Sequence, residues 1–222
     1  MKIGILQTGH APDALLPDHG DYNDLFERLL GGHGFAFTTW SVVDDAFPDG
    51  PDDADGWLIT GSRHGAYEPH PWIPPLEELI RDIHAAQKPL VGICFGHQII
   101  AQALGGTVEK FPGGWSVGRQ SYTLDNEHLH LNAWHQDQVT KLPPEARILG
   151  QSAFCENAVL AYGDHILTIQ PHPEFDAAFT QGLITHRGGA VPADQLAQAQ
   201  ADLAHPTDST RIAARIAAHL KQ

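Results

Sequence analysis

The chain has 222 residues, of which 42% are hydrophobic and 18% charged, and its formal net charge is −14. This length and apolar content suffice for one large core, and we expect residues 1–222 to form a single α/β domain. The 13 basic residues are scattered along the chain. Nucleic acid and anionic membrane surfaces are therefore not expected as partners, because phosphates are bound by clustered lysines and arginines.

Three further features of the sequence bear on the cellular location of the protein. No apolar run approaches the length of a membrane span, and the N-terminus lacks a basic stretch followed by a signal-type apolar run. Two cysteines, Cys94 and Cys155, are too few for a disulfide framework. A cytoplasmic location is the expectation.

Strand and helix patterns alternate through the first hundred residues. We predict strands over 2–7, 35–43, 56–60 and 89–93, helices over 21–30, 72–86 and 96–104, and an acidic solvated loop over 44–55. This order predicts a doubly wound, mostly parallel sheet with flanking helices, whose site lies at the C-terminal ends of the strands. Gly61 and Cys94 each follow such an end.

The second half of the chain has shorter elements. We predict strands over 107–111, 115–124, 128–132 and 147–150, a hairpin of 158–162 with 165–170, and helices over 175–185, 194–204 and 207–220. Thr207 or Asp208 is a candidate N-cap for the last helix. These short strands predict a small antiparallel region beside the parallel sheet.

The segment Gly92-Ile-Cys-Phe-Gly-His-Gln98 is the most informative in the chain. It places Cys94 at a tight strand-to-helix turn, with glycines two positions to either side where such a turn favours a missing Cβ. The first N–H groups of the following helix favour a negative charge on the sulfur. The pattern is typical of a nucleophile, although a lone cysteine is more often a small buried core residue.

A cysteine nucleophile needs a base, and Gln170-Pro-His-Pro-Glu174 offers one directly after an apolar strand. The two prolines favour extended backbone, in which residues two apart project to the same side. His172 and Glu174 can therefore form a hydrogen-bonded pair in which the carboxylate fixes the imidazole tautomer. A stiff surface turn is the alternative interpretation of the same segment.

Taken together, these two motifs resemble the class I (triad) glutamine amidotransferases, and the resemblance runs roughly from Ile3 to Phe179. The layout is similar to the amidotransferase module of GMP synthase, and more so to stand-alone members such as the plant γ-glutamyl peptidases. The resemblance implies a catalytic triad of Cys94, His172 and Glu174.

The resemblance also implies roles for residues around the triad. Backbone N–H groups of Gly61 and Phe95 would form the oxyanion hole. The implied substrate-binding residues are Gln98, Trp134, His135 and Asp137, with Asp137 as a possible anchor for the substrate α-ammonium group. The implied reaction is attack of the Cys94 thiolate on a γ-glutamyl amide, giving a γ-glutamyl thioester that water hydrolyses, with no cofactor and no metal.

Two features depart from the family pattern. Phe95 stands where leucine is common, but only its backbone N–H is needed. The turn after the third strand reads Gly61-Ser-Arg-His-Gly-Ala-Tyr-Glu68, where many synthase-linked members have Gly-Gly-Pro. Because this turn lies beside the substrate, the usual acceptor chemistry is in doubt.

Three functions therefore remain open. The chain is an amidotransferase subunit that passes ammonia to a synthase partner, a self-contained γ-glutamyl hydrolase or peptidase, or a binding protein that keeps the fold without turnover. The intact triad weighs against the third.

Other candidate residues have simpler explanations. His128 and His130 share a strand face near His135, but a metal site is the minority interpretation in a chain with 15 histidines. Cys155 is expected in the core. Trp115 either walls the pocket or packs under a glycine turn.

Overall fold

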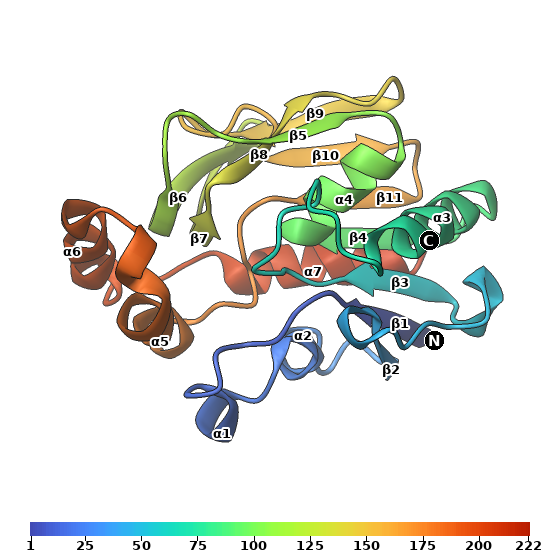
Figure 1. Cartoon of the computed structure of the whole chain (residues 1–222), viewed down its shortest axis with the longest axis horizontal. Helices are drawn as coiled ribbons and strands as arrows, with labels where there is room; N and C mark the ends of the chain where they lie inside the picture. Colours follow the sequence, from blue (N-terminus) through green and yellow to red (C-terminus); the bar gives the residue numbers. More distant parts are fainter.

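The computed structural model describes residues 1–222 as a nine-stranded sheet with helices on both faces, accompanied by a separate two-stranded sheet (Figure 1). The strands are β1 (Lys2–Gln7), β2 (Ala36–Ser41), β3 (Gly56–Ile59), β4 (Leu90–Ile93), β5 (Thr107–Lys110), β6 (Ser116–Leu124), β7 (Glu127–His135), β8 (Asp137–Lys141), β9 (Ala146–Gln151), β10 (Val159–Tyr162) and β11 (Ile166–Ile169). The helices are α1 (Leu16–His19), α2 (Tyr22–Leu29), α3 (Ile73–Ala85), α4 (Phe95–Ala103), α5 (Ala177–Arg187), α6 (Ala193–Asp202) and α7 (Ser209–Leu220), with short 3-10 helices at Val42–Asp44, Pro51–Asp53 and Gly188–Ala190.

The large sheet has the strand order β2-β1-β3-β4-β11-β10-β9-β6-β7. Neighbouring strands are parallel from β2 to β11. They are antiparallel from β11 onward to β7, and the separate pair β5–β8 is antiparallel as well. The predicted fold class is confirmed, and the antiparallel strands largely continue the central sheet.

Two hydrophobic clusters of 22 buried residues each show why the central strands are apolar throughout. One cluster joins residues of α2 and α7 to the sheet, and the other joins residues of α3 and α4. Successive residues of β3 divide between them, with Leu58 in the first cluster and Trp57 and Ile59 in the second. In Figure 1, α7 accordingly passes behind the sheet while α3 and α4 lie in front of it. Such two-sided burial is typical of parallel strands.

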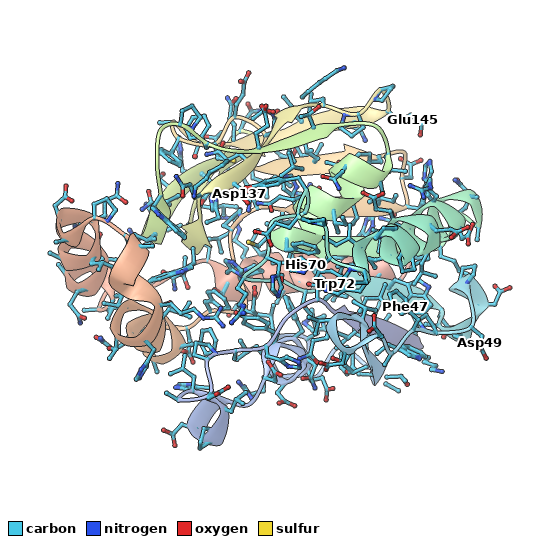
Figure 2. The ribbon with its side chains drawn as sticks, viewed as in Figure 1. Phe47, Asp49, His70, Trp72, Asp137 and Glu145 are labelled. Carbon is cyan, nitrogen blue, oxygen red and sulfur yellow. The ribbon has the colours of Figure 1, made fainter.

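The carboxyl ends of β3, β4 and β11 meet at one edge because these strands are parallel neighbours. Chain segments that follow them carry Gly61, Cys94 and His172, respectively. The acidic loop lies elsewhere: Asp49 is at the outer margin of the molecule, whereas His70 and Asp137 lie near its middle (Figure 2). No helix has both the length and the apolar character needed to cross a membrane.

Three local features differ from the sequence prediction. Strand β8 was not predicted, because Asp137-Gln-Val-Thr-Lys141 contains a single apolar residue and gives little strand signal. Helix α1 was also not predicted. Asp208 precedes α7 but does not cap it with its side chain, because its carboxylate accepts a hydrogen bond of 2.7 Å from the His130 N–H.

Candidate active site

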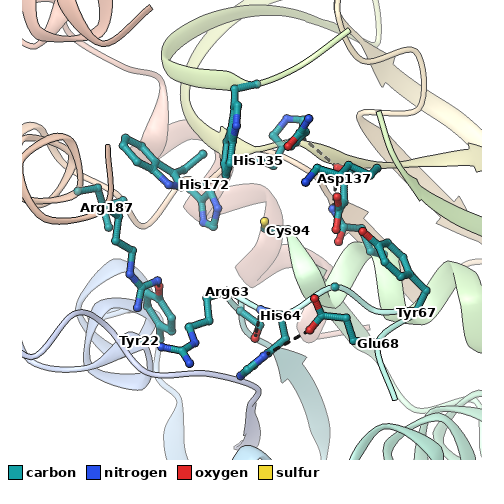
Figure 3. A pocket seen from close by; sticks show the side chains of 18 of the residues that line it. Tyr22, Arg63, His64, Tyr67, Glu68, Cys94, His135, Asp137, His172 and Arg187 are labelled. Atoms are coloured by element: carbon teal, nitrogen blue, oxygen red, sulfur yellow. Dashed lines mark hydrogen bonds and ion pairs between the residues drawn. The ribbon is translucent and has the colours of Figure 1, made fainter. Parts of the chain in front are cut away.

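Cys94 lies at a sharp turn between β4 and α4. Its backbone has φ 53° and ψ −101°, a positive-φ conformation that is strained for a residue with a Cβ. The turn is fixed on both sides, since the Cys94 N–H donates to the Ile169 carbonyl at 2.9 Å and the Gly96 N–H donates to the Thr60 carbonyl at 3.1 Å. The side chain therefore projects into the cavity at the end of the sheet (Figure 3).

The glycines of this turn are required by its neighbours. A Cβ on Gly92 would lie 2.5 Å from the Gly96 carbonyl oxygen, and a Cβ on Gly96 would lie 2.4 Å from the Ile59 carbonyl oxygen. Both distances are too short for any side chain. These contacts explain the glycine spacing that the sequence shows around Cys94.

His172 and Glu174 form the predicted pair. Glu174 Oε1 lies 2.7 Å from His172 Nδ1, and the side chains are only 1% and 4% exposed, respectively. A short bridge to β7 fixes the backbone, because the His172 N–H donates to the Asn132 carbonyl at 2.8 Å. The ring of Phe175 stacks on the imidazole, with centroids 3.9 Å apart. The imidazole is thus held on its face, at one nitrogen and through its backbone.

The pKa of His172 reflects the same surroundings. Burial lowers it, but interactions with the charges of Cys94 and Glu174 outweigh burial and raise the pKa to about 10. His172 is therefore an imidazolium at neutral pH when the Cys94 sulfur is a thiolate. This charge distribution is the one expected for a cysteine nucleophile with a histidine proton donor.

Gly61 lies against both predicted catalytic side chains. A Cβ built on it would lie 3.0 Å from His172 Cε1 and 3.8 Å from Cys94 Cβ. The Gly61 N–H donates no hydrogen bond within the chain. Phe95 opens α4, so its N–H has no acceptor in the helix. Both N–H groups are therefore available for the predicted oxyanion hole.

The four predicted substrate-binding residues all line the cavity, but two of them are occupied by contacts within the chain. The Gln98 side-chain amide donates to the Asp137 carbonyl at 2.9 Å and to Gln170 Oε1 at 3.1 Å. Buried His135 donates from Nδ1 to the Asp137 carbonyl, 3.2 Å away, and burial lowers its pKa to about 3. Half-buried Trp134 and Asp137 face the cavity more openly. Their contacts with substrate stay a prediction.

Several cavity residues were not identified from the sequence. The cavity, of about 390 Å³, is also lined by Tyr22, Ser62, Arg63, His64, Gly65, Tyr67, Glu68, Lys110, Trp115, Gln136, Phe175, Leu183 and Arg187. Residues 62–68 belong to the turn that departs from the family pattern. This departure is the feature of the sequence that points to them. Arg187 comes from the end of α5, where no motif marks it. Trp115 proves to be a cavity residue.

One cluster outside the triad has metal-binding chemistry. Ligand atoms of His64, Glu68 and His70 lie within 4.8 Å of one another, and His70 Nε2 is 2.7 Å from Glu68 Oε2. The imidazole of His70 also stacks on Trp72, with centroids 5.7 Å apart (Figure 2). Glu68 and His70 are thus paired with each other without an ion, and we assign no metal here.

The remaining candidates lie away from the triad chemistry. His128 and His130 are on β7 and do not join a third metal-ligating side chain. Cys155 is 1% exposed within a core cluster, as expected, and burial raises the pKa of its thiol to about 12. It is therefore a poor nucleophile.

Comparison with known proteins identifies relatives with the same layout. Residues 42–184 match the family model described as "Glutamine amidotransferase class-I". The chain is 34% identical to γ-glutamyl peptidase 3 of Arabidopsis thaliana over 175 residues, which cover 71% of this chain and 70% of that protein. It is 32% identical to the GMP synthase of Bordetella parapertussis over 151 residues, covering 60% of this chain and 28% of that protein.

Solved structures show the same fold. A glutamine amidotransferase from Methylobacillus flagellatus superimposes with a TM-score of 0.77 at 24% identity, covering 99% of this chain and 91% of that chain. A glutamine amidotransferase from Thermotoga maritima gives a TM-score of 0.73 at 20% identity. These likenesses concern the fold alone.

Proposed function

Because the chain belongs to the class-I glutamine amidotransferase family, we propose that it hydrolyses γ-glutamyl amides through a triad of Cys94, His172 and Glu174. The observation that carries the proposal is the buried, 2.7 Å His172–Glu174 pair beside a cysteine that has a positive φ in a strand-to-helix turn. The relatives named γ-glutamyl peptidases support hydrolysis without a synthase partner.

In the first half of the reaction, the Cys94 thiolate attacks the γ-carbonyl carbon and forms a C–S bond. The carbonyl oxygen becomes an oxyanion that accepts hydrogen bonds from the N–H groups of Gly61 and Phe95. Removing one such donor costs about 3 kcal/mol in a hydrolase that has been tested. The imidazolium of His172 then gives its proton to the leaving amine as the C–N bond breaks, leaving a γ-glutamyl thioester.

In the second half, His172 is neutral and accepts a proton from water while the water oxygen attacks the thioester carbon. The C–S bond breaks, glutamate leaves, and the thiolate and imidazolium are restored. Glu174 holds His172 Nδ1 throughout, so that Nε2 carries every proton transfer.

A second candidate function is ammonia supply to a synthase. The similarity to a GMP synthase over 151 residues favours it. In this case glutamine would be the substrate, and a partner protein would stimulate its turnover. The cavity chemistry would be the same, and only the leaving group and its acceptor would differ.

Glutamate release from glutamine and from a panel of γ-glutamyl dipeptides separates these functions. We expect wild-type protein alone to cleave the dipeptides, Cys94→Ser to lose that activity, and Cys155→Ser to retain it as the matched control. Glutamine turnover that appears only with a partner protein would favour ammonia supply. Dipeptide cleavage that survives Cys94→Ser would contradict the proposed triad.

A further inference from the structure

Two arginines of the cavity have no carboxylate partner. Arg63 and Arg187 line the cavity with Cys94 and take part in no ion pair. Of the other arginines, Arg81, Arg211 and Arg215 each lie beside a carboxylate, and the unpaired Arg28, Arg119 and Arg147 lie outside this cavity. The chain has 27 acidic and 13 basic residues. In so acidic a protein, two unpaired guanidinium groups at one cavity indicate an anion that comes from outside the chain.

The chain holds Arg187 in place while leaving most of its donors free. One Nη1 hydrogen goes to the Tyr22 hydroxyl at 3.2 Å and one Nη2 hydrogen to the His10 carbonyl at 2.9 Å. A guanidinium has five N–H donors, so three remain. Arg63, which also lines the cavity, makes no hydrogen bond through its side chain.

The two arginines lie on one side of the nucleophile. Figure 3 shows Arg63 and Arg187 near Tyr22, with Cys94 between this group and the group of Tyr67, Glu68 and Asp137. Asp137 is half-buried, and Lys110, whose charge interacts with Asp137, also lines the cavity. A carboxylate and an ammonium group on that second side suit the α-ammonium and α-carboxylate of a glutamyl group.

The position of the reacting carbon then orients the substrate. Its γ-carbonyl carbon must lie at the Cys94 sulfur, so a glutamyl group on the Asp137 side sends the leaving amine toward Arg63 and Arg187. Ammonia, the leaving group of glutamine, has nothing for a guanidinium to bind. An amino acid or peptide leaving group has a carboxylate that accepts two parallel hydrogen bonds from an arginine.

We propose that Arg63 and Arg187 form a subsite for the carboxylate of the leaving amine, so that the substrates are γ-glutamyl amino acids or peptides with a free carboxylate. This inference rests on the proposed hydrolase function and adds the part of the substrate that the cavity selects. The two arginine side chains would thus distinguish a peptidase, whose leaving group has a carboxylate, from a glutaminase, whose leaving group is ammonia.

The test compares γ-glutamylalanine with γ-glutamylalaninamide, which differ only at the leaving-group carboxylate. We expect wild-type kcat/KM to favour the carboxylate roughly tenfold to a hundredfold, as for a charged hydrogen bond. Arg63→Gln and Arg187→Gln should each shrink that ratio. Arg147→Gln is the matched control, because Arg147 also has no ion-pair partner but is exposed on β9, outside this cavity, and we expect it to leave the ratio unchanged.

Binding to Cys94→Ala protein, measured by calorimetry, gives a second readout that needs no turnover. We expect the carboxylate peptide to bind more tightly than the amide, and Arg63→Gln in this background to remove the difference. Equal binding and equal turnover of the two peptides, or a preference that survives both arginine substitutions, would overturn the subsite. Carboxylate-dependent binding without any turnover by wild-type protein would support the subsite and contradict the hydrolase function instead.

Discussion

In the proposed triad, Glu174 decides which nitrogen of His172 is free to act on Cys94. Its Oε1 accepts from Nδ1 at 2.7 Å, and the stacked ring of Phe175 prevents the imidazole from tilting away. A base that is fixed in this way loses little entropy in the transition state. The carboxylate also stabilises the imidazolium by its charge.

Replacing Glu174 by glutamine should therefore impair turnover more than folding. We expect Glu174→Gln to lower kcat by about two to four orders of magnitude, because the amide no longer fixes the tautomer. The matched control is Asp176→Asn, two residues later, where the carboxylate caps α5 by accepting from the Phe179 N–H at 2.7 Å. Steady-state kinetics of both variants checks this, and a kcat for Glu174→Gln within about threefold of wild type would be incompatible with the triad.

The protonation of His172 is a second test at this scale. Its pKa of about 10 predicts an imidazolium at pH 8, and Cys94→Ala should lower that pKa because the interactions with Cys94 that raise it are lost. Nitrogen chemical shifts from NMR measure both values. His97, whose pKa burial lowers to about 3, should stay neutral in the same spectra.

The raised pKa of His172 makes the stability of the folded state depend on pH. Since the pKa of His172 is raised from 6.5 to about 10 on folding, its protonation stabilises the folded state. This contribution is complete below pH 6.5 and is lost as the pH rises through 10. A wild-type His172 that titrates near its ordinary value would contradict the arrangement of charges.

At the scale of elements, the strand-to-helix turn depends on the close approach of α4 to β3. We expect Gly96→Ala to lower the free energy of unfolding by about 1–3 kcal/mol, because its Cβ would lie 2.4 Å from the Ile59 carbonyl oxygen. Gly189→Ala is the matched control, since a Cβ there meets nothing within 4 Å. Urea denaturation measures both. Equal stability of Gly96→Ala and wild type would show that this approach is not required.

Elements with strong apolar periodicity were predictable from the sequence. Strands β1, β3, β4 and helices α2, α3, α4 and α7 lie within a few residues of their predicted bounds, because each buries an apolar stripe or core. Strand β8 was not predictable from the sequence, because its pairing with β5 is long-range and its residues are mostly polar. The end of α7 was predictable from Ile216 and Leu220, but the His130 N–H that donates to the Asp208 carboxylate was not.

The residues of the site likewise include some that the sequence predicts and some that it does not. Cys94, His172 and Glu174 stand in short motifs in which glycine or proline restricts the backbone, so their proximity could be predicted. Arg63 and Arg187 could not, because an exposed turn and a helix end carry no pattern that predicts which way a long side chain points. Only the three-dimensional structure places both of them at one cavity.

At the scale of the whole molecule, the C-terminal helix and the catalytic turn share a core. Ile216 of α7 is fully buried in the cluster that also contains Ile93 and Cys94. We propose that residues 1–222 unfold as one cooperative domain, since this cluster joins the first strand to the last helix.

Removing a buried side chain from that helix tests the cooperative unit. We expect Ile216→Ala to lower the free energy of unfolding by about 2–5 kcal/mol, with coincident transitions by circular dichroism and tryptophan fluorescence. Leu16→Ala serves as control, because Leu16 is 36% exposed and should have little effect. Separate transitions by the two probes would indicate more than one domain.

The γ-glutamyl thioester on Cys94 is the intermediate on which the proposed function depends. Acid quenching during turnover of a γ-glutamyl dipeptide, followed by peptide mass spectrometry, detects it directly. We predict a γ-glutamyl group on the peptide that contains Cys94, none on the peptide that contains Cys155, and neither adduct nor turnover in Cys94→Ala. Full turnover by Cys94→Ala, or an acyl group on another residue, would contradict the assignment of Cys94 as nucleophile.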